Sequence, residues 1–200
     1  MLTYFVQSFS GPAGPFMYAL LTLLGLSIAV MIDRAITLTR ARCDADALLR
    51  KVEPAAAKGE GLTLGATPLE QVAAAGLAHR DPETAWDAMS AVAVDAELRI
   101  RRRIAYLSTV ASVSTMVGLV GTVYGLILAF GAVGTVSAAE RAARLSEGSA
   151  TAMATTAFGL IVAIPSLVAY AVADAAARDL TGRMEQVASR IVVALRSGRA

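Results

Sequence analysis

Three long stretches of this chain contain no charged residue, and they constrain its fold more than any other feature. They cover residues 16–32, 104–139 and 148–173 of the 200-residue sequence. A bilayer core of about 30 Å takes roughly 20 apolar residues to cross as a helix. The second and third stretches exceed this length, and residues 11–14 can extend the first one at the interface. We therefore predict three transmembrane helices.

The overall composition favours the membrane over a soluble fold. Hydrophobic residues make up 56% of the chain and charged residues 17%, with a mean hydropathy of +0.60. A soluble domain carries about 25% charged residues. If the three stretches were core helices of a soluble protein, too little polar surface would remain to cover them. We expect an all-α membrane protein whose second and third transmembrane helices extend as long helices into the cytoplasm.

The residue counts exclude several classes of function. Cys43 is the single cysteine and His79 the single histidine. One cysteine forms no internal disulfide and no cysteine-based zinc site, and a Ser-His-Asp triad inside the spans would need a histidine there. The net charge of +2 gives no nucleic-acid footprint, and the sequence has no Walker-type glycine loop. We expect no enzyme activity, no cofactor, no bound metal and no nucleic-acid partner.

The positions of lysine and arginine set the predicted orientation. Residues 33–103 and 174–200 together hold all but two of the 18 basic residues, and the two exceptions are Arg141 and Arg144. Basic segments stay in the cytoplasm. We therefore predict a periplasmic N-terminus and a cytoplasmic C-terminus in a bacterial inner membrane. The start of the chain lacks the basic region of a signal peptide, so we expect the first span to be retained.

This topology divides the chain into seven segments. In chain order they are a periplasmic N-terminus (1–15), the first span (16–32), a cytoplasmic helical insert (33–103), the second span (104–136), a periplasmic loop (137–147), the third span (148–173) and a cytoplasmic amphipathic helix and tail (174–200).

The soluble segments carry helix signals. We predict helices over residues 40–58 and 67–79, the second opened by a capping box of Thr67 and Glu70. From Pro82 no breaker occurs before the glycines of the second span, which predicts one continuous helix over residues 82–134. Two apolar stripes at helical spacing indicate packing against neighbouring helices; they are Trp86, Met89, Ala93, Ala96 and Ile100, and Leu180, Met184, Val187, Ile191 and Leu195.

Small and hydroxyl-bearing residues follow one face of each of the last two spans. They are Thr115, Gly118, Thr122 and Gly125 in the second, with a GxxxG at Gly121 and Gly125, and Ala152, Thr156, Gly159, Ala163 and Ser166 in the third, with Thr151 and Thr155 beside them. One interpretation is close helix packing, which small residues allow in lipid. The other is a hydroxyl-lined path for water or ions, since a threonine oxygen can orient water or coordinate a cation.

The spans contain no Asp, Glu, Lys, Arg or His, although Asp33 and Glu147 lie at their edges. Proton relays in membranes use buried ionisable groups. If this protein moves protons, the carboxylate within the bilayer must come from another chain. Pro165 removes one helical hydrogen bond in the third span, which favours either a static kink or a hinge.

Two motifs resemble the signatures of a known family. Residues 118–127 (GLVGTVYGLI) and 154–165 (ATTAFGLIVAIP) are similar to the second-span and third-span signatures of the MotA/TolQ/ExbB proton-channel family. The order of the spans, the topology and the long cytoplasmic insert agree with its TolQ/ExbB-like branch. The resemblance extends over about residues 16–195.

The resemblance implies a motor driven by the proton motive force. Five subunits would surround two copies of a single-span partner similar to ExbD, TolR or MotB, whose intramembrane Asp would titrate as H⁺ or Na⁺ passes. Ion flow would turn the ring relative to the partner and transmit force to the envelope or a surface machine. Thr122 and Thr156 match the pore-facing threonines, with Thr155 as a neighbour.

One position departs from the family pattern. Relatives often carry a Glu where this chain has Thr151, and Glu147 lies one turn further out, at a possible outer mouth. The departure leaves the choice between proton and sodium open. The alternative function is a structural membrane scaffold that oligomerises through small-residue faces without conducting ions.

Overall fold

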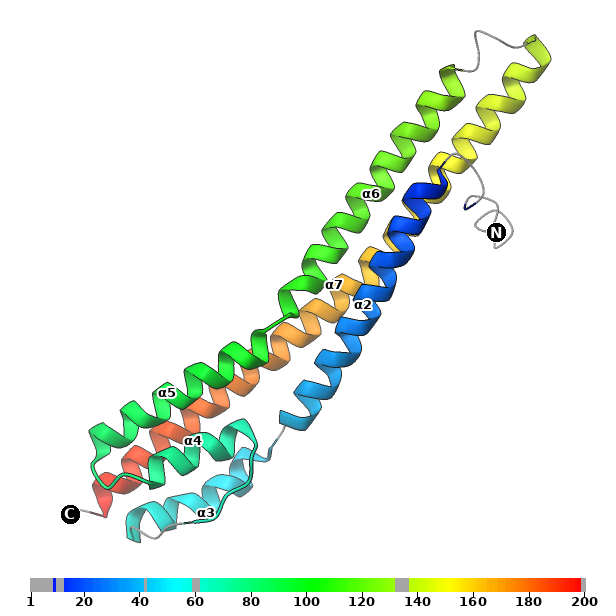
Figure 1. The fold of residues 1–200 in the computed structure, drawn as a ribbon. Coiled ribbons are helices and arrows are strands. Elements are labelled where there is room, and N and C mark those ends of the chain that lie inside the picture. Colours follow the sequence, from blue (N-terminus) through cyan, green and yellow to red (C-terminus); the bar gives the residue numbers. More distant parts are fainter. Residues whose placement is uncertain (1–8, 10–12, 42, 59–61, 132–136, 199–200) are drawn as a thin grey trace. The chain divides into compact units, whose positions relative to one another are not determined.

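The computed structural model describes residues 9, 13–41, 43–58, 62–131 and 137–198, and these form helices and no strand. The helices, labelled in Figure 1, are α2 (Gly14–Ala41), α3 (Ala45–Lys58), α4 (Pro68–Leu77), α5 (Pro82–Arg101), α6 (Ile104–Gly131) and α7 (Ala138–Ser197). Three helical stretches are long and apolar enough to cross a bilayer. The predicted all-α membrane fold with three spans is therefore confirmed.

The chain divides into two compact units. The membrane unit comprises Met1–Ile32 and Arg103–Ala171, and it contains all three apolar spans. The polar unit comprises Asp33–Arg102 and Val172–Ala200. Helices α2 and α7 contribute to both units, because each continues past the end of its apolar span.

Glycines and some large apolar side chains such as Met17, Leu20 and Leu107 are buried inside the membrane unit, and many other large apolar side chains are exposed on it. Figure 1 shows α6 running beside the first half of α7. The buried positions of α6 include Gly118, Gly121 and Gly125. Large side chains on the same helices are exposed, among them Met116, Leu119, Ile127, Phe130, Met153, Ile161 and Ile164. Exposure of large apolar side chains is expected where lipid, in place of water, surrounds the helices.

The polar unit has a conventional apolar core built from its five helical pieces, which are the end of α2, α3, α4, α5 and the end of α7. Leu48, Leu49 and Val52 of α3 are buried, and so is the whole α7 stripe from Leu180 to Leu195. Gly76 lets α4 approach α5 and α7 closely, because a Cβ there would lie 2.5 Å from the Met89 sulfur. The α5 stripe is only partly buried, because Trp86 remains 42% exposed.

Two predicted helix starts in the polar unit are confirmed. Helix α4 begins at Pro68, where the Thr67 backbone N–H donates to Glu70 Oε2 over 3.0 Å. Helix α5 begins at Pro82, where the Asp81 carboxylate accepts the Thr84 N–H over 3.0 Å. Both starts combine a polar cap with proline in the first turn, where its missing N–H is not needed.

The expectation of one continuous helix over residues 82–134 is wrong. Helix α5 ends at Arg101, α6 begins at Ile104, and Arg103 has a φ of 71°. A left-handed residue other than glycine is disfavoured sterically, so surrounding contacts must hold it. The guanidinium of Arg34 supplies such contacts. Its Nη1 donates to the carbonyls of Ile100 over 3.2 Å and Arg102 over 2.7 Å, which caps the end of α5.

Other boundaries also differ from the sequence expectations. The predicted helix over residues 40–58 is interrupted between Ala41 and Ala45, where the Asp44 carboxylate caps the start of α3. The residues expected as a periplasmic loop, 137–147, are helical from Ala138, with the Ser137 hydroxyl and N–H both donating to Glu140. Residues 132–136 and most of 1–15 lie outside the described part of the chain.

Candidate functional site

The two threonines singled out by the sequence form a contact between α6 and α7. Thr122 Oγ1 and Thr156 Oγ1 are hydrogen-bonded to each other although 34 residues separate them. Both side chains are partly buried. The contact follows from close helix approach, because a Cβ on Gly118 would lie 3.3 Å from the Thr156 Cα.

Two backbone carbonyls complete this hydroxyl pair. Gly118 O lies 3.0 Å from Thr122 Oγ1 and 3.2 Å from Thr156 Oγ1, and Ala152 O lies 3.4 Å from Thr122 Oγ1. Each hydroxyl carries one proton and has two lone pairs. One hydroxyl can therefore donate to the other while the second donates to a carbonyl. Oxygen lone pairs remain on the pair, and a water or a hard cation can use them.

Thr155 packs within the chain, and its expected place beside an ion path stays a prediction. Its side chain is fully buried, and its hydroxyl donates to Ala152 O over 2.7 Å. It fills the space opposite Gly121, where a Cβ would lie 2.9 Å from both Thr155 Cβ and Oγ1. The sequence motif brings Thr155 and Thr156 next to each other, but the structure gives their hydroxyls different neighbours.

The predicted packing glycines lie at the α6–α7 contact. A Cβ on Gly125 would lie 3.2 Å from Ala152 Cβ, and one on Gly159 would lie 2.8 Å from the Ser114 carbonyl oxygen. Gly118 and Gly121 meet the backbone or side chains of Thr155 and Thr156. Each glycine thus allows a backbone approach that a larger residue would prevent, as expected for helices associating in lipid.

The remaining predicted residues lie apart from the hydroxyl pair. Thr151 donates to the Glu147 carbonyl one turn away, over 2.9 Å. The Glu147 side chain is exposed, with one carboxylate oxygen 3.8 Å from Arg144 Nη1. Pro165 lies inside α7, which continues through it. The roles of outer mouth for Glu147 and hinge for Pro165 stay predictions.

Sequence reasoning missed two buried polar features of the membrane unit. Ser27 Oγ of α2 and Ser166 Oγ of α7 are both fully buried and lie 2.6 Å apart. Ser114 Oγ is buried without a hydrogen-bond partner. The available signal for the serine pair was a lone Ser27 in the first apolar run. Ser27 could not be matched to Ser166 from the sequence, because neither helix alone determines which of its residues faces the other helix.

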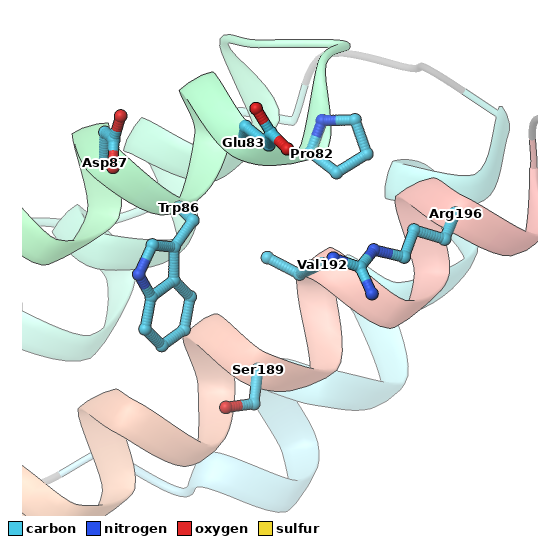
Figure 2. Close-up of a pocket in the computed structure, with 7 residues that line it drawn as sticks. All are labelled: Pro82, Glu83, Trp86, Asp87, Ser189, Val192 and Arg196. Atoms are coloured by element: carbon cyan, nitrogen blue, oxygen red, sulfur yellow. The ribbon is translucent and has the colours of Figure 1, made fainter.

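The polar unit contains an open groove with mixed charge. Figure 2 shows the Trp86 indole beside it, with Glu83 and Asp87 from α5 and Ser189, Val192 and Arg196 from α7. Its volume is about 500 Å³. The acidic and basic groups around the indole favour no single class of ligand. Among the described residues, no group of three or more His, Cys, Asp and Glu side chains could hold a metal ion.

These features define a helical membrane protein with three apolar spans and a hydroxyl pair between the last two. The sequence model of the MotA/TolQ/ExbB proton channel family matches residues 65–186, and the chain belongs to that family. The match covers more than half of the sequence and includes both Thr122 and Thr156. No curated protein sequence matches the chain.

Proposed function

We propose that this chain is the ring-forming subunit of an ion-driven motor in a bacterial inner membrane, with its N-terminus in the periplasm and its C-terminus in the cytoplasm. The observation that carries the proposal is the hydroxyl pair of Thr122 and Thr156, which leaves oxygen lone pairs at the contact of two membrane helices. Membership of a proton channel family supports ion passage as its use. The cation would be H⁺ or Na⁺.

The proposal includes a second polypeptide, because the apolar runs of this chain contain no Asp, Glu, Lys, Arg or His. A threonine hydroxyl does not exchange its proton near neutral pH, so it positions water or a cation while another group takes up the charge. We propose a single-span partner of the ExbD, TolR or MotB kind that supplies an intramembrane Asp. Two copies inside a ring of five subunits would complete the motor. No enzyme activity and no cofactor belong to this function.

The test removes each hydroxyl while keeping the shape of the side chain. The complex would be purified through an affinity tag on this chain, reconstituted into liposomes and assayed for proton or sodium uptake with a dye for each ion. Thr122→Val and Thr156→Val should each lower the rate of uptake about tenfold or more, which corresponds to about 1.4 kcal/mol or more of barrier. Serine at either position should restore most of the rate.

Thr109→Val provides the matched control. Thr109 lies on α6 outside the face of Thr122, and its hydroxyl donates to Ala105 O of the same helix over 3.2 Å. This variant should conduct at the unmodified rate. Full uptake by both valine variants of the pair, in complexes of normal composition, would contradict the proposal.

A structural scaffold is the second candidate, favoured by the close glycine contacts of α6 with α7. Under this function, Thr122→Val and Thr156→Val would lower the yield of assembled complex rather than the rate of ion uptake. Measuring both quantities on the same preparations separates the two functions.

A further inference from the structure

A pocket of the polar unit gathers basic and hydroxyl side chains from three helices. Its volume is about 430 Å³. Thr37 and Arg40 come from the end of α2, Thr67 and Gln71 from the start of α4, and Arg99 from the end of α5. Such a set of guanidinium, hydroxyl and amide groups is typical of sites that bind a phosphate group.

The charges around the pocket favour an anion. Arg40 is exposed and takes part in no ion pair within the described part of the chain. Arg99 is paired with Asp95 one turn away, but both side chains are more than half exposed, so water screens this pair and it is weak. The Glu70 carboxylate, which accepts the N–H and hydroxyl of Thr67, keeps its negative charge but is not one of the residues that line the pocket.

The walls of the pocket are held in place by hydrogen bonds. The buried Arg34 fastens α2 to the end of α5 through the carbonyls of Ile100 and Arg102, and Ile100 is itself part of the lining. Gln71 Nε2 donates to Ala66 O over 2.9 Å and fixes the segment before α4. A ligand therefore meets helices that are already fixed, which lowers the entropic cost of binding.

The position of the pocket along the chain favours a lipid over a free ion. Thr37 and Arg40 follow the last residue of the first apolar run, Ile32, by about 8 and 12 Å of helix at 1.5 Å per residue. The headgroup layer extends about 5–8 Å beyond the hydrocarbon on each side, and an arginine side chain can reach back toward it. Arg99 lies close in sequence to the second apolar run, which begins at Ile104.

We propose that this pocket binds a phosphate group through Arg40 and Arg99. The phosphate can come from the headgroup of an anionic phospholipid or from a free phosphate ion. The position of the pocket close to the ends of the apolar runs favours the lipid. This site is separate from the hydroxyl pair and does not depend on the proposed motor function.

The experiment measures ligand binding to the purified full chain in detergent by native mass spectrometry. The probes are phosphatidylglycerol, phosphatidylcholine and inorganic phosphate, each titrated separately. The unmodified protein should retain phosphatidylglycerol in preference to phosphatidylcholine. Arg40→Gln/Arg99→Gln should weaken phosphatidylglycerol binding about tenfold or more, and Arg40→Lys/Arg99→Lys should recover part of it because charge remains but the guanidinium fork does not.

The matched control is Arg50→Gln/Arg190→Gln, which removes the same charge from two exposed arginines of the polar unit outside this pocket. It should bind phosphatidylglycerol as the unmodified protein does. Binding of inorganic phosphate with the same dependence on Arg40 and Arg99, but not of lipid, would assign the site to a free ion.

Two outcomes would overturn the proposal. One is an equal loss of phosphatidylglycerol in the two glutamine double variants, which would indicate a nonspecific charge effect. The other is unchanged binding of both anionic probes in Arg40→Gln/Arg99→Gln. Circular dichroism of each variant would show that its helices are intact, so that a loss of binding is not a loss of fold.

Discussion

Buried hydroxyls carry most of the polar chemistry inside the membrane unit, and they differ in what surrounds them. Ser27 and Ser166 bond to each other in a fully buried contact, whereas the Thr122–Thr156 pair is only partly buried. The Thr155 hydroxyl donates to Ala152 O of its own helix. A hydroxyl satisfied inside a helix contact stabilises packing, and only one that retains some exposure can meet water or an ion.

The Glu70 carboxylate gives a pH-dependent prediction at the same scale. The hydrogen bond from the Thr67 hydroxyl, and then that from the Thr67 backbone N–H, lower the pKa of Glu70 below its usual 4.5. A group whose pKa is lowered by folding contributes stability above its unfolded pKa, and this stability is lost as the pH falls through the folded pKa. Glu70→Ala should therefore destabilise the protein by about 0.5–1 kcal/mol at pH 7.

Thermal unfolding of the full chain in detergent at pH 7 and near pH 3 checks this prediction. Glu185→Ala is the control, since Glu185 is an exposed acid in a helix and the substitution changes helix propensity equally. The difference between the two variants should shrink at the lower pH. A difference that stays constant with pH would show that the Glu70 charge has no part in capping α4.

Residue-level prediction from the sequence succeeded where local chemistry decides the outcome. The caps at Thr67 and Asp81 are properties of four consecutive residues, and the glycines that contact α7 follow from small-residue spacing. The Ser27–Ser166 contact and the burial of Arg34 depend on which helix faces which, and a single sequence does not encode that relation in any short pattern.

At the scale of helices, the break between α5 and α6 was not predictable from local signals. Arg101, Arg102 and Arg103 contain no breaker, and arginine is a good helix former. The break is accompanied by a tertiary contact, in which Arg34 from another helix takes the carbonyls at the end of α5. The start of α7 at Ala138, by contrast, has a local signal, because Ser137 and Glu140 have the same spacing as the capping box of Thr67 and Glu70.

Replacing Arg34 tests whether this contact stabilises the end of α5. Arg34 is 7% exposed, and Arg34→Met keeps the apolar length of the side chain while leaving the carbonyls of Ile100 and Arg102 without their donor. Unsatisfied buried carbonyls cost about 1–3 kcal/mol, so the unfolding midpoint should fall accordingly. Hydrogen exchange should also quicken at the Arg102 amide, which donates to Leu98 O in the last turn of α5.

Arg50→Met serves as the comparison, because Arg50 is an exposed arginine of α3 and the same atoms are removed. It should change neither the unfolding midpoint nor the exchange at Arg102. If Arg34→Met behaved like Arg50→Met, the capping contact would contribute nothing and the break at Arg103 would need another cause.

At the scale of the whole molecule, charge and hydropathy assign the segments to the two sides of a membrane. The three apolar spans lie in one compact unit, and the basic segments 33–103 and 174–200 lie mostly in the other. With 16 of the 18 basic residues in residues 33–103 and 174–200, the positive-inside rule predicts that the polar unit lies in the cytoplasm. Residues 137–147 are then predicted to face the periplasm.

The single cysteine makes this orientation testable by labelling intact cells with a membrane-impermeant maleimide. Cys43 is half-buried in the polar unit, so Cys43→Ser/Arg50→Cys offers a thiol at an exposed position of the same unit. The Cys43 thiol of the unmodified protein and the thiol at position 50 of the double variant should each react only after the membrane is permeabilised. Cys43→Ser/Ala143→Cys places an exposed thiol in the segment assigned to the periplasm and should react in intact cells. Reaction at position 50 but not 143 before permeabilisation would reverse the topology, and the polar unit could not then be cytoplasmic.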